Sequence, residues 1–194
     1  MIKSASQLLI SFILFSLAST GQSIPKSNKK IMHENITKVI AHRGAWKNTN
    51  LPENSFASLK AAIREKCYGS ETDVHMTDDG YVVVNHDPHF HDIDIQNSTL
   101  KQLRKYKLAN GEDLPLLSDL LKLITQQKST KLIIEIKTSQ RGQEWGLKTA
   151  DKVTAEVAKY KASKHVKYIS FGFDICKRIK QNVPSAHVEY LMGD

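Results

Sequence analysis

Short apolar runs alternate with amphipathic stretches along residues 37–194. Runs of β-branched residues between turn signals predict strands, whereas apolar residues three or four positions apart predict helices. The core strands expected from this pattern lie at 39–41, 69–76, 131–136, 166–170 and 188–191. The helices are expected at 55–65, 99–106, 114–125, 145–161 and 174–181. Strands that alternate with helices predict a parallel sheet with right-handed crossovers.

The segment that follows residue 76 departs from this alternation. Asp78, Asp79 and Gly80 give a strong turn signal, and a β-type run at 81–84 comes directly after it. Residues 88–97 show no periodicity and are expected to form a loop.

The core strands at 39–41, 69–76 and 131–136, and the β-type run at 81–84, hold or lead into charged residues or histidines. This is typical of a barrel of parallel strands that holds its chemistry at the strand ends. A closed barrel of this kind needs eight strands and about 250 residues. Here five core strands fit, and the chain of 194 residues stops shortly after the fifth. We therefore expect an α/β fold, a (β/α)8 TIM-type barrel truncated after about five strand–helix units.

The amino-terminal residues differ from the rest of the chain. Lys3 gives a positive start, the apolar run at 8–18 has the length of a signal peptide, and small residues follow it. We expect a signal peptide at 1–24, a polar linker at 25–36 and the barrel domain at 37–194. An uncleaved anchor or a buried helix is the alternative for the apolar run. The expected location is periplasmic or secreted, with no stable membrane insertion after cleavage.

The charge composition indicates which kinds of molecule the protein binds. The chain has 28 Lys and Arg against 20 Asp and Glu, which gives a formal net charge of +8. The lysines are scattered over the predicted helices, so nucleic acid is not expected as a partner, whereas a small anionic substrate is. Cys67 and Cys176 are far apart in sequence and are expected to be buried free thiols. No pattern indicates an oligomeric state.

Three carboxylates have the spacing of a cation site. Glu71 and Asp73 are two residues apart on a predicted strand, so their side chains point to the same face. Glu135 lies at the end of another apolar strand and is a natural third ligand. Oxygen ligands of this kind suit Mg²⁺ or Ca²⁺. The alternative is an acidic strand end that lysines neutralise at the surface.

Histidines and basic residues accompany these carboxylates. His42 and His86 each follow an apolar run, and two imidazoles can divide the roles of general acid and general base. Arg43 and Lys137 can bind phosphate oxygens, although a salt bridge to the same carboxylates is the alternative. His75 shares the face of Asp73 and is expected to be a core residue near the site.

The order of these residues resembles that of the glycerophosphodiester phosphodiesterase family from about residue 38 onward. The matching motifs are His-Arg-Gly at 42–44, Pro-Glu-Asn-Ser at 52–55, Glu-x-Asp at 71–73, Thr-x-Asp-Gly at 77–80, His-Asp at 86–87, Leu-Pro-Leu-Leu at 114–117 and Glu-Ile-Lys at 135–137. The resemblance implies a (β/α)8 barrel that hydrolyses glycerophosphodiesters to glycerol 3-phosphate and an alcohol with a divalent cation, Mg²⁺ or Ca²⁺.

The resemblance also implies a role for each matching residue. His42 and His86 correspond to the catalytic acid–base pair, and Arg43 and Lys137 to phosphate contacts. The implied metal ligands are Glu71, Asp73 and Glu135, with Glu53 as a supporting acidic residue near the site.

Two alternatives remain open at this point. Nothing in the chain matches the last strands of the family, so the protein could be an inactive truncated remnant of such an enzyme. A related barrel phosphodiesterase that acts on lipid substrates is the other alternative. The predicted loops at 47–51 and 89–96 are mostly polar, with Trp46 as the main aromatic residue, and this favours a soluble substrate.

Overall fold

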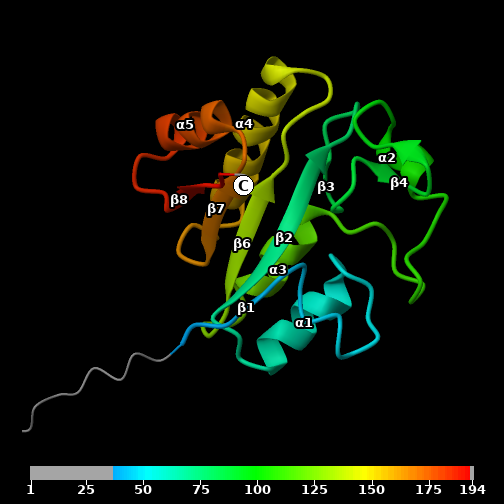
Figure 1. Cartoon of the computed structure of the whole chain (residues 1–194), viewed down its shortest axis with the longest axis vertical. Helices are drawn as coiled ribbons and strands as arrows, with labels where there is room; N and C mark the ends of the chain where they lie inside the picture. The colour runs from blue at the N-terminus through cyan, green and yellow to red at the C-terminus, as the bar shows by residue number, and fades with distance from the viewer. Residues whose placement is uncertain (1–36, 193–194) are drawn as a thin grey trace, which may run out of the picture. The chain divides into compact units, whose positions relative to one another are not determined.

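The computed structural model describes residues 37–192 (Figure 1). The signal peptide expected at 1–24 and the linker expected at 25–36 lie outside these residues, so both stay predictions. Within the described part of the chain, no helix combines the length and the apolar character needed to cross a membrane.

Five parallel strands form the main path of one sheet, in the order β1-β2-β6-β7-β8. Their bounds are Ile40–Ala41 for β1, Gly69–Met76 for β2, Lys131–Ile136 for β6, Val166–Ser170 for β7 and Val188–Tyr190 for β8. The sheet is open in the described residues, with β1 and β8 at its edges. This arrangement confirms the expected α/β fold with five parallel strands of a TIM-type barrel.

Helices connect and flank these strands (Figure 1). They are α1 (Phe56–Arg64), α2 (Leu100–Leu103), α3 (Leu117–Ile124), α4 (Gln143–Lys159) and α5 (Phe173–Asn182). Helix α2 is shorter than the expected 99–106, because only Leu100 and Leu103 are buried and the chain turns away after Arg104. The expected buried free thiols, Cys67 and Cys176, are confirmed.

The helices bury one face of the sheet. On β6, Leu132, Ile134 and Ile136 are fully buried in the main hydrophobic core together with residues of α3 and α4. Because side chains alternate along a strand, Ile133 and Glu135 point to the opposite face. The same alternation places Val74 of β2 in the core. The residues on either side of Val74 therefore face the interior of the barrel-type sheet.

The segment after β2 is more structured than expected. Strand β3 (Val82–Val84) turns back and pairs antiparallel with β2, as the turn signal at 78–80 indicated. The loop expected at 88–97 contains a second antiparallel pair, β4 (His89–Phe90) and β5 (Ile93–Asp94), so that expectation was wrong.

The β4–β5 hairpin forms because of its turn and its buried apolar neighbours. His91 and Asp92, which join β4 to β5, both have positive φ, as a type I′ hairpin turn requires. Phe90 and Ile95 are buried in a small second core with Val83, Leu100, Leu103 and Leu114. A run this short has no periodicity to reveal the pairing in the sequence.

Strands β1 and β3 share one edge of β2. Strand β1 pairs with Gly69 and Ser70, while β3 pairs with residues 74–76. The other edge of β2 is occupied by β6 as far as Val74. A gap in the ladder is therefore left at residues 71–73, between the end of β1 and the end of β3. The ends of these two strands approach the gap from opposite directions.

Candidate active site

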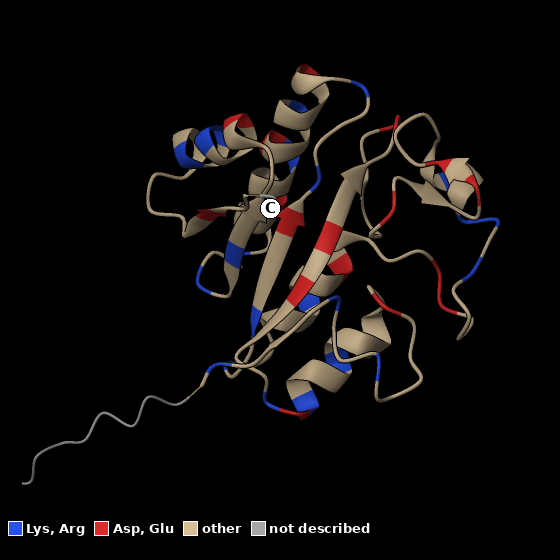
Figure 2. Ribbon diagram, in the orientation of Figure 1, with Lys and Arg blue, Asp and Glu red and all other residues tan. Residues whose placement is uncertain are grey.

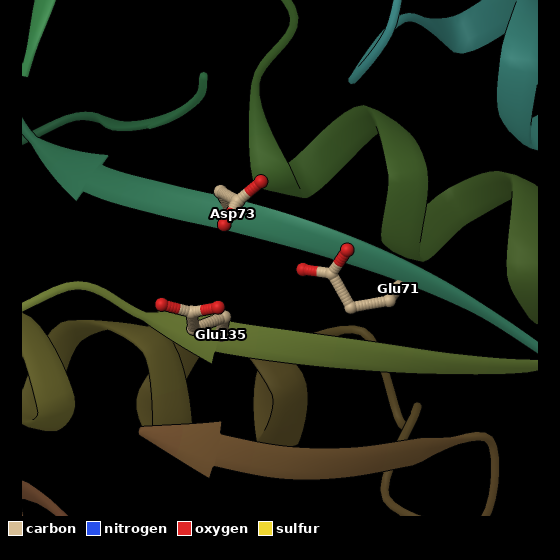
Figure 3. Close-up of side chains that lie close together, drawn as sticks. All are labelled: Glu71, Asp73 and Glu135. Atoms are coloured by element: carbon tan, nitrogen blue, oxygen red, sulfur yellow. The ribbon is translucent and has the colours of Figure 1, made fainter. Parts of the chain in front are cut away.

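Three buried carboxylates meet on the inner face of the sheet. Glu71 and Asp73 lie on β2, and Glu135 is the direct neighbour of Asp73 in the parallel ladder between β2 and β6. One carboxylate oxygen of each residue lies within 4.8 Å of the others. Figure 3 shows the three side chains pointing into a common space between the two strands. The sequence prediction that these residues come together is confirmed.

The three buried carboxylates repel one another, and a bound cation would stabilise them. The pKa of Glu71 is raised to about 8, mainly because the group is buried and further because Asp73 is negatively charged. Among residues 37–192, Glu71 Oε1 is one of the buried side-chain atoms with no hydrogen-bond partner. A buried carboxylate oxygen without a donor, facing two more carboxylates, fits a hard divalent ion such as Mg²⁺ or Ca²⁺.

Lys137 supplies the nearest positive charge. Its Nζ lies 2.7 Å from Asp73 Oδ1 and 2.8 Å from Glu135 Oε1. Burial lowers the pKa of Lys137, but the hydrogen bonds to the two carboxylates outweigh this and raise it overall. The salt bridge that the sequence left open as an alternative is therefore present. It does not exclude a phosphate contact, because a flexible lysine can exchange one oxygen partner for another.

Arg43 is held between two other acidic residues. Its backbone N–H donates to Glu71 Oε2 at 2.8 Å, and its Nη1 donates to both carboxylate oxygens of Glu53 at 3.1 and 3.2 Å. Arg43 has a positive φ of 56°, and Gly44 follows with a φ of 82°. This turn directs the Arg43 amide at Glu71. Glu53, expected as a supporting residue, orients the guanidinium group.

The two histidines follow β1 and β3, the strands that end on opposite sides of the gap in β2. His42 follows β1; its side chain is 66% exposed, and its Nε2 lies 3.8 Å from Glu71 Oε2. The pKa of His42 is lowered, mainly because the side chain is partly buried and further because Arg43 is positively charged. His86 comes two residues after β3, and its Nδ1 lies 2.7 Å from Asp87 Oδ1.

The strand that precedes His86 is not one of the parallel strands of the main path. Strand β3 runs antiparallel to β2, and the Asn85 amide donates to the Asp73 carbonyl at 3.1 Å. His75 supports the same turn, because its Nε2 lies 3.2 Å from the His86 carbonyl oxygen. His75 is buried on β2, as expected for a core residue near the site.

Sequence reasoning missed the part that Asn54 plays. The N-cap of α1 is the next residue, Ser55, whose hydroxyl accepts from the Ser58 backbone N–H. Asn54 instead donates from Nδ2 to Asp73 Oδ2 at 2.7 Å. The signal that could have found this residue is its position directly after Glu53 in the Pro-Glu-Asn-Ser motif.

Figure 2 places these acidic residues in the wider charge pattern. Red segments mark the middle of β2 and the end of β6, whereas most lysines and arginines lie on helices and loops. The negative charge of the site is therefore concentrated on two neighbouring strands, with the basic residues Arg43 and Lys137 packed directly against it.

Comparisons with known proteins agree with this geometry. The sequence model of the Glycerophosphoryl diester phosphodiesterase family matches residues 42–193. A glycerophosphodiester phosphodiesterase of Bacillus altitudinis is 31% identical over 116 residues, which are 54% of this chain and 46% of that protein. One of Caldanaerobacter subterraneus is 36% identical over 118 residues, which are 53% of this chain and 46% of that protein.

Solved structures show the same fold. A glycerophosphodiester phosphodiesterase from Parabacteroides distasonis is 39% identical, with a TM-score of 0.77, and the match covers 81% of this chain and 66% of that one. The chain spans about half the length of the two curated relatives named above.

Proposed function

The chain belongs to the glycerophosphoryl diester phosphodiesterase family, and on this premise we propose that it hydrolyses glycerophosphodiesters to glycerol 3-phosphate and an alcohol. The observation that carries the proposal is the buried cluster of Glu71, Asp73 and Glu135. The chain spans only part of the length of these relatives, so we propose, rather than infer from them, that it has their activity.

The proposed cofactor is one divalent cation, Mg²⁺ or Ca²⁺, held by Glu71, Asp73 and Glu135. When bound, such an ion neutralises charge on a phosphate ester and stabilises the charge that develops on its oxygens. The proposed role of Arg43 and Lys137 is to bind the remaining phosphate oxygens. Support comes from their positions, since both basic groups already lie against the carboxylates of the cluster.

The proposed acid–base pair is His42 and His86. One imidazole takes the proton from the attacking hydroxyl group, and the other donates a proton to the alcohol oxygen as its bond to phosphorus breaks. The net reaction adds one water across that bond. The first histidine then releases its proton to solvent and the second takes one up from solvent, so both return to their starting protonation states. Support comes from the placement of the histidines, which follow strands that approach the carboxylates from opposite directions.

The proposed location, periplasmic or secreted, rests on the sequence of residues 1–24 alone. Sequencing the amino terminus of protein recovered from the culture medium or periplasm tests it. A mature chain that still begins at Met1 would contradict export by a cleaved signal.

An assay of the purified chain on glycerophosphocholine tests the activity. Glycerol 3-phosphate release is measured after chelation with EDTA and again after Mg²⁺ or Ca²⁺ is restored. We expect release only with a cation, and its loss in Asp73→Asn. The matched control is Asp113→Asn, since Asp113 forms a similar pair with Lys107 at 2.6 Å on the surface.

Two outcomes would contradict the proposal. Release that persists in EDTA would exclude the cation, and equal loss in Asp73→Asn and Asp113→Asn would exclude a specific role for the cluster. Lysophosphatidylcholine is assayed in parallel, because a preference for it would move the substrate class from soluble diesters to lipids.

A further inference from the structure

We propose that Asn54 is a positioning residue for the cation site: its side chain fills the gap in the ladder of β2 and fixes the Asp73 carboxylate, so that Oδ1 faces the ion. The inference rests on the proposed function, because it gives Asn54 a task in the cation site proposed above. It goes beyond that function by naming the residue that orients one ligand.

Both polar atoms of the Asn54 side chain form hydrogen bonds to β2. Its Nδ2 donates to Asp73 Oδ2 at 2.7 Å, and its Oδ1 accepts from the Asp73 backbone N–H at 3.1 Å and from Thr72 Oγ1 at 3.0 Å. Asn54 is only 5% exposed. Two of these three hydrogen bonds end on the same residue, Asp73, one on its backbone and one on its side chain. One side chain, that of Asn54, therefore holds both the backbone N–H and the carboxylate of Asp73.

The position of Asn54 follows from the interrupted edge of β2. Strand β1 stops pairing at Ser70, and β3 begins pairing at Val74, so no strand reaches the Asp73 amide on this edge. The Asp73 carbonyl on the same edge accepts from Asn85. A buried N–H without an acceptor is costly, and Asn54 Oδ1 removes that cost. An amide side chain thus replaces one rung of the ladder.

The backbone of Asn54 is built for this task. Its φ of 51° lies in the left-handed region, which asparagine tolerates better than other residues with a β carbon. Its N–H donates to the Arg43 carbonyl at 2.9 Å, which ties the 52–55 segment to the turn that follows β1. Asn54 therefore couples the Asp73 ligand to the loop that carries Arg43 and Glu53.

The chemistry of the donor suits a cation ligand. Asn54 uses Asp73 Oδ2, so the remaining oxygen, Oδ1, is the one that can face an ion; Lys137 now contacts it. A neutral amide orients the carboxylate without adding a positive charge that would repel the ion. Groups that orient a metal ligand in this way typically contribute 10–100-fold to metal affinity.

The test compares Asn54→Gly with Asn50→Gly. Glycine keeps the left-handed backbone at both positions, since Asn50 has a φ of 56°, but only Asn54→Gly removes contacts to Asp73. We expect the dissociation constant for Mg²⁺ or Ca²⁺, measured by calorimetry, to rise about tenfold in Asn54→Gly. Asn50→Gly should match the native protein.

Two further measurements keep the inference falsifiable. Thr72→Val removes one hydrogen bond to Asn54 and leaves Asp73 untouched, so we expect a smaller rise in the cation dissociation constant. Hydrogen exchange of the Asp73 amide, followed by NMR without cation, should be faster in Asn54→Gly than in the native protein. This second measurement depends on neither cation binding nor activity.

The outcomes separate this inference from the proposed function. An Asn54→Gly variant that loses thermal stability but keeps native cation affinity would show a structural role only and would overturn the positioning role. A native chain that binds neither Mg²⁺ nor Ca²⁺ would overturn the cation site itself, and with it any role of Asn54 toward an ion. Accelerated Asp73 exchange with weakened cation binding supports the inference.

Discussion

Lys137 Nζ lies 2.7 Å from Asp73 Oδ1, whereas Asn54 binds the other carboxylate oxygen, Oδ2. A lysine and a divalent ion at this place repel one another, by about 4 kcal/mol for each pair of unit charges about 4 Å apart at an effective dielectric constant of about 20. Lys137 therefore weakens cation binding, but its charge lies where it can bind a phosphate oxygen of the substrate.

Replacing this lysine should separate the two effects. In Lys137→Met we expect cation binding to tighten by at least about tenfold, because the repulsion described above is removed; the gain stays below the full Coulomb energy, since the flexible lysine can move away from a bound ion. Hydrolysis of glycerophosphocholine should fall. Calorimetry and the hydrolysis assay measure the two quantities on the same preparation. Lys107→Met, which breaks the exposed pair with Asp113, serves as the control and should change neither. Weaker cation binding in Lys137→Met would contradict the prediction.

Cation binding should depend on pH through Glu71. With its pKa raised to about 8, this carboxyl group is mostly protonated at neutral pH, and a cation must displace the proton. We expect the affinity to rise by up to about tenfold per pH unit as pH increases toward 8, and to level off above it. Calorimetry in two buffers with different ionisation enthalpies counts the released proton.

The matched variant for this prediction is Glu71→Gln. It cannot release a proton, so its weaker cation binding should lose most of the pH dependence seen between pH 6 and 8. A native protein whose affinity is flat over that range would show that Glu71 is already ionised there.

The histidines should act as one unit. His42→Ala and His86→Ala should each lower turnover by roughly 10²–10⁴-fold, the usual contribution of acid–base catalysis. The double variant should be much less than multiplicatively worse. His187→Ala is the control, because His187 pairs with Glu189 as His86 pairs with Asp87 but lies before β8, apart from the carboxylate cluster. A His86→Ala variant with near-native turnover would point to another proton donor.

Gly44 should be intolerant of any side chain. A β carbon there would lie 2.3 Å from Ser58 Oγ and 2.9 Å from its backbone carbonyl carbon. Gly80 has a nearly identical φ, 80° against 82°, but an added β carbon meets nothing within 4 Å. Both alanine variants should lose about 1 kcal/mol from the left-handed backbone, and Gly44→Ala roughly 1–3 kcal/mol more from the clash.

Thermal denaturation of the two glycine variants measures the difference. Equal losses in Gly44→Ala and Gly80→Ala would mean that Ser58 moves aside without cost. The turn after β1 would then be less rigid than its contact with Ser58 indicates.

The sequence predicted best the elements that are buried and regular. Strands β2, β6 and β7 have the expected bounds. Strand β6 is a short apolar run of Leu and Ile, and β2 ends just before the turn signal at 78–80. Glu71, Asp73 and Glu135 were found as well, since strand alternation fixes which face they share.

The sequence failed where long-range contacts decide the structure. The 89–94 hairpin is too short for a periodic pattern, and its turn residues, His91 and Asp92, are not the Asn-Gly type that signals such a turn. The task of Asn54 depends on a gap in β2 that exists only once β1 and β3 have both docked. The Pro-Glu-Asn-Ser motif marks residue 54 as a candidate site residue, but it does not reveal which backbone group the side chain binds.

The position of β3 also bears on how this fold can vary. The path β1-β2-β6-β7-β8 is continuous without β3, so residues 77–130 form an excursion between two neighbouring strands. This excursion contributes His86, two residues after the end of β3, whereas the carboxylates lie on β2 and β6. The segment between His86 and α3 packs in its own small core, whereas α3 packs under β6 in the main core. That segment can therefore be lengthened, shortened or exchanged by evolution while the carboxylates stay in register. New substrate preferences can arise there without rebuilding the chemistry.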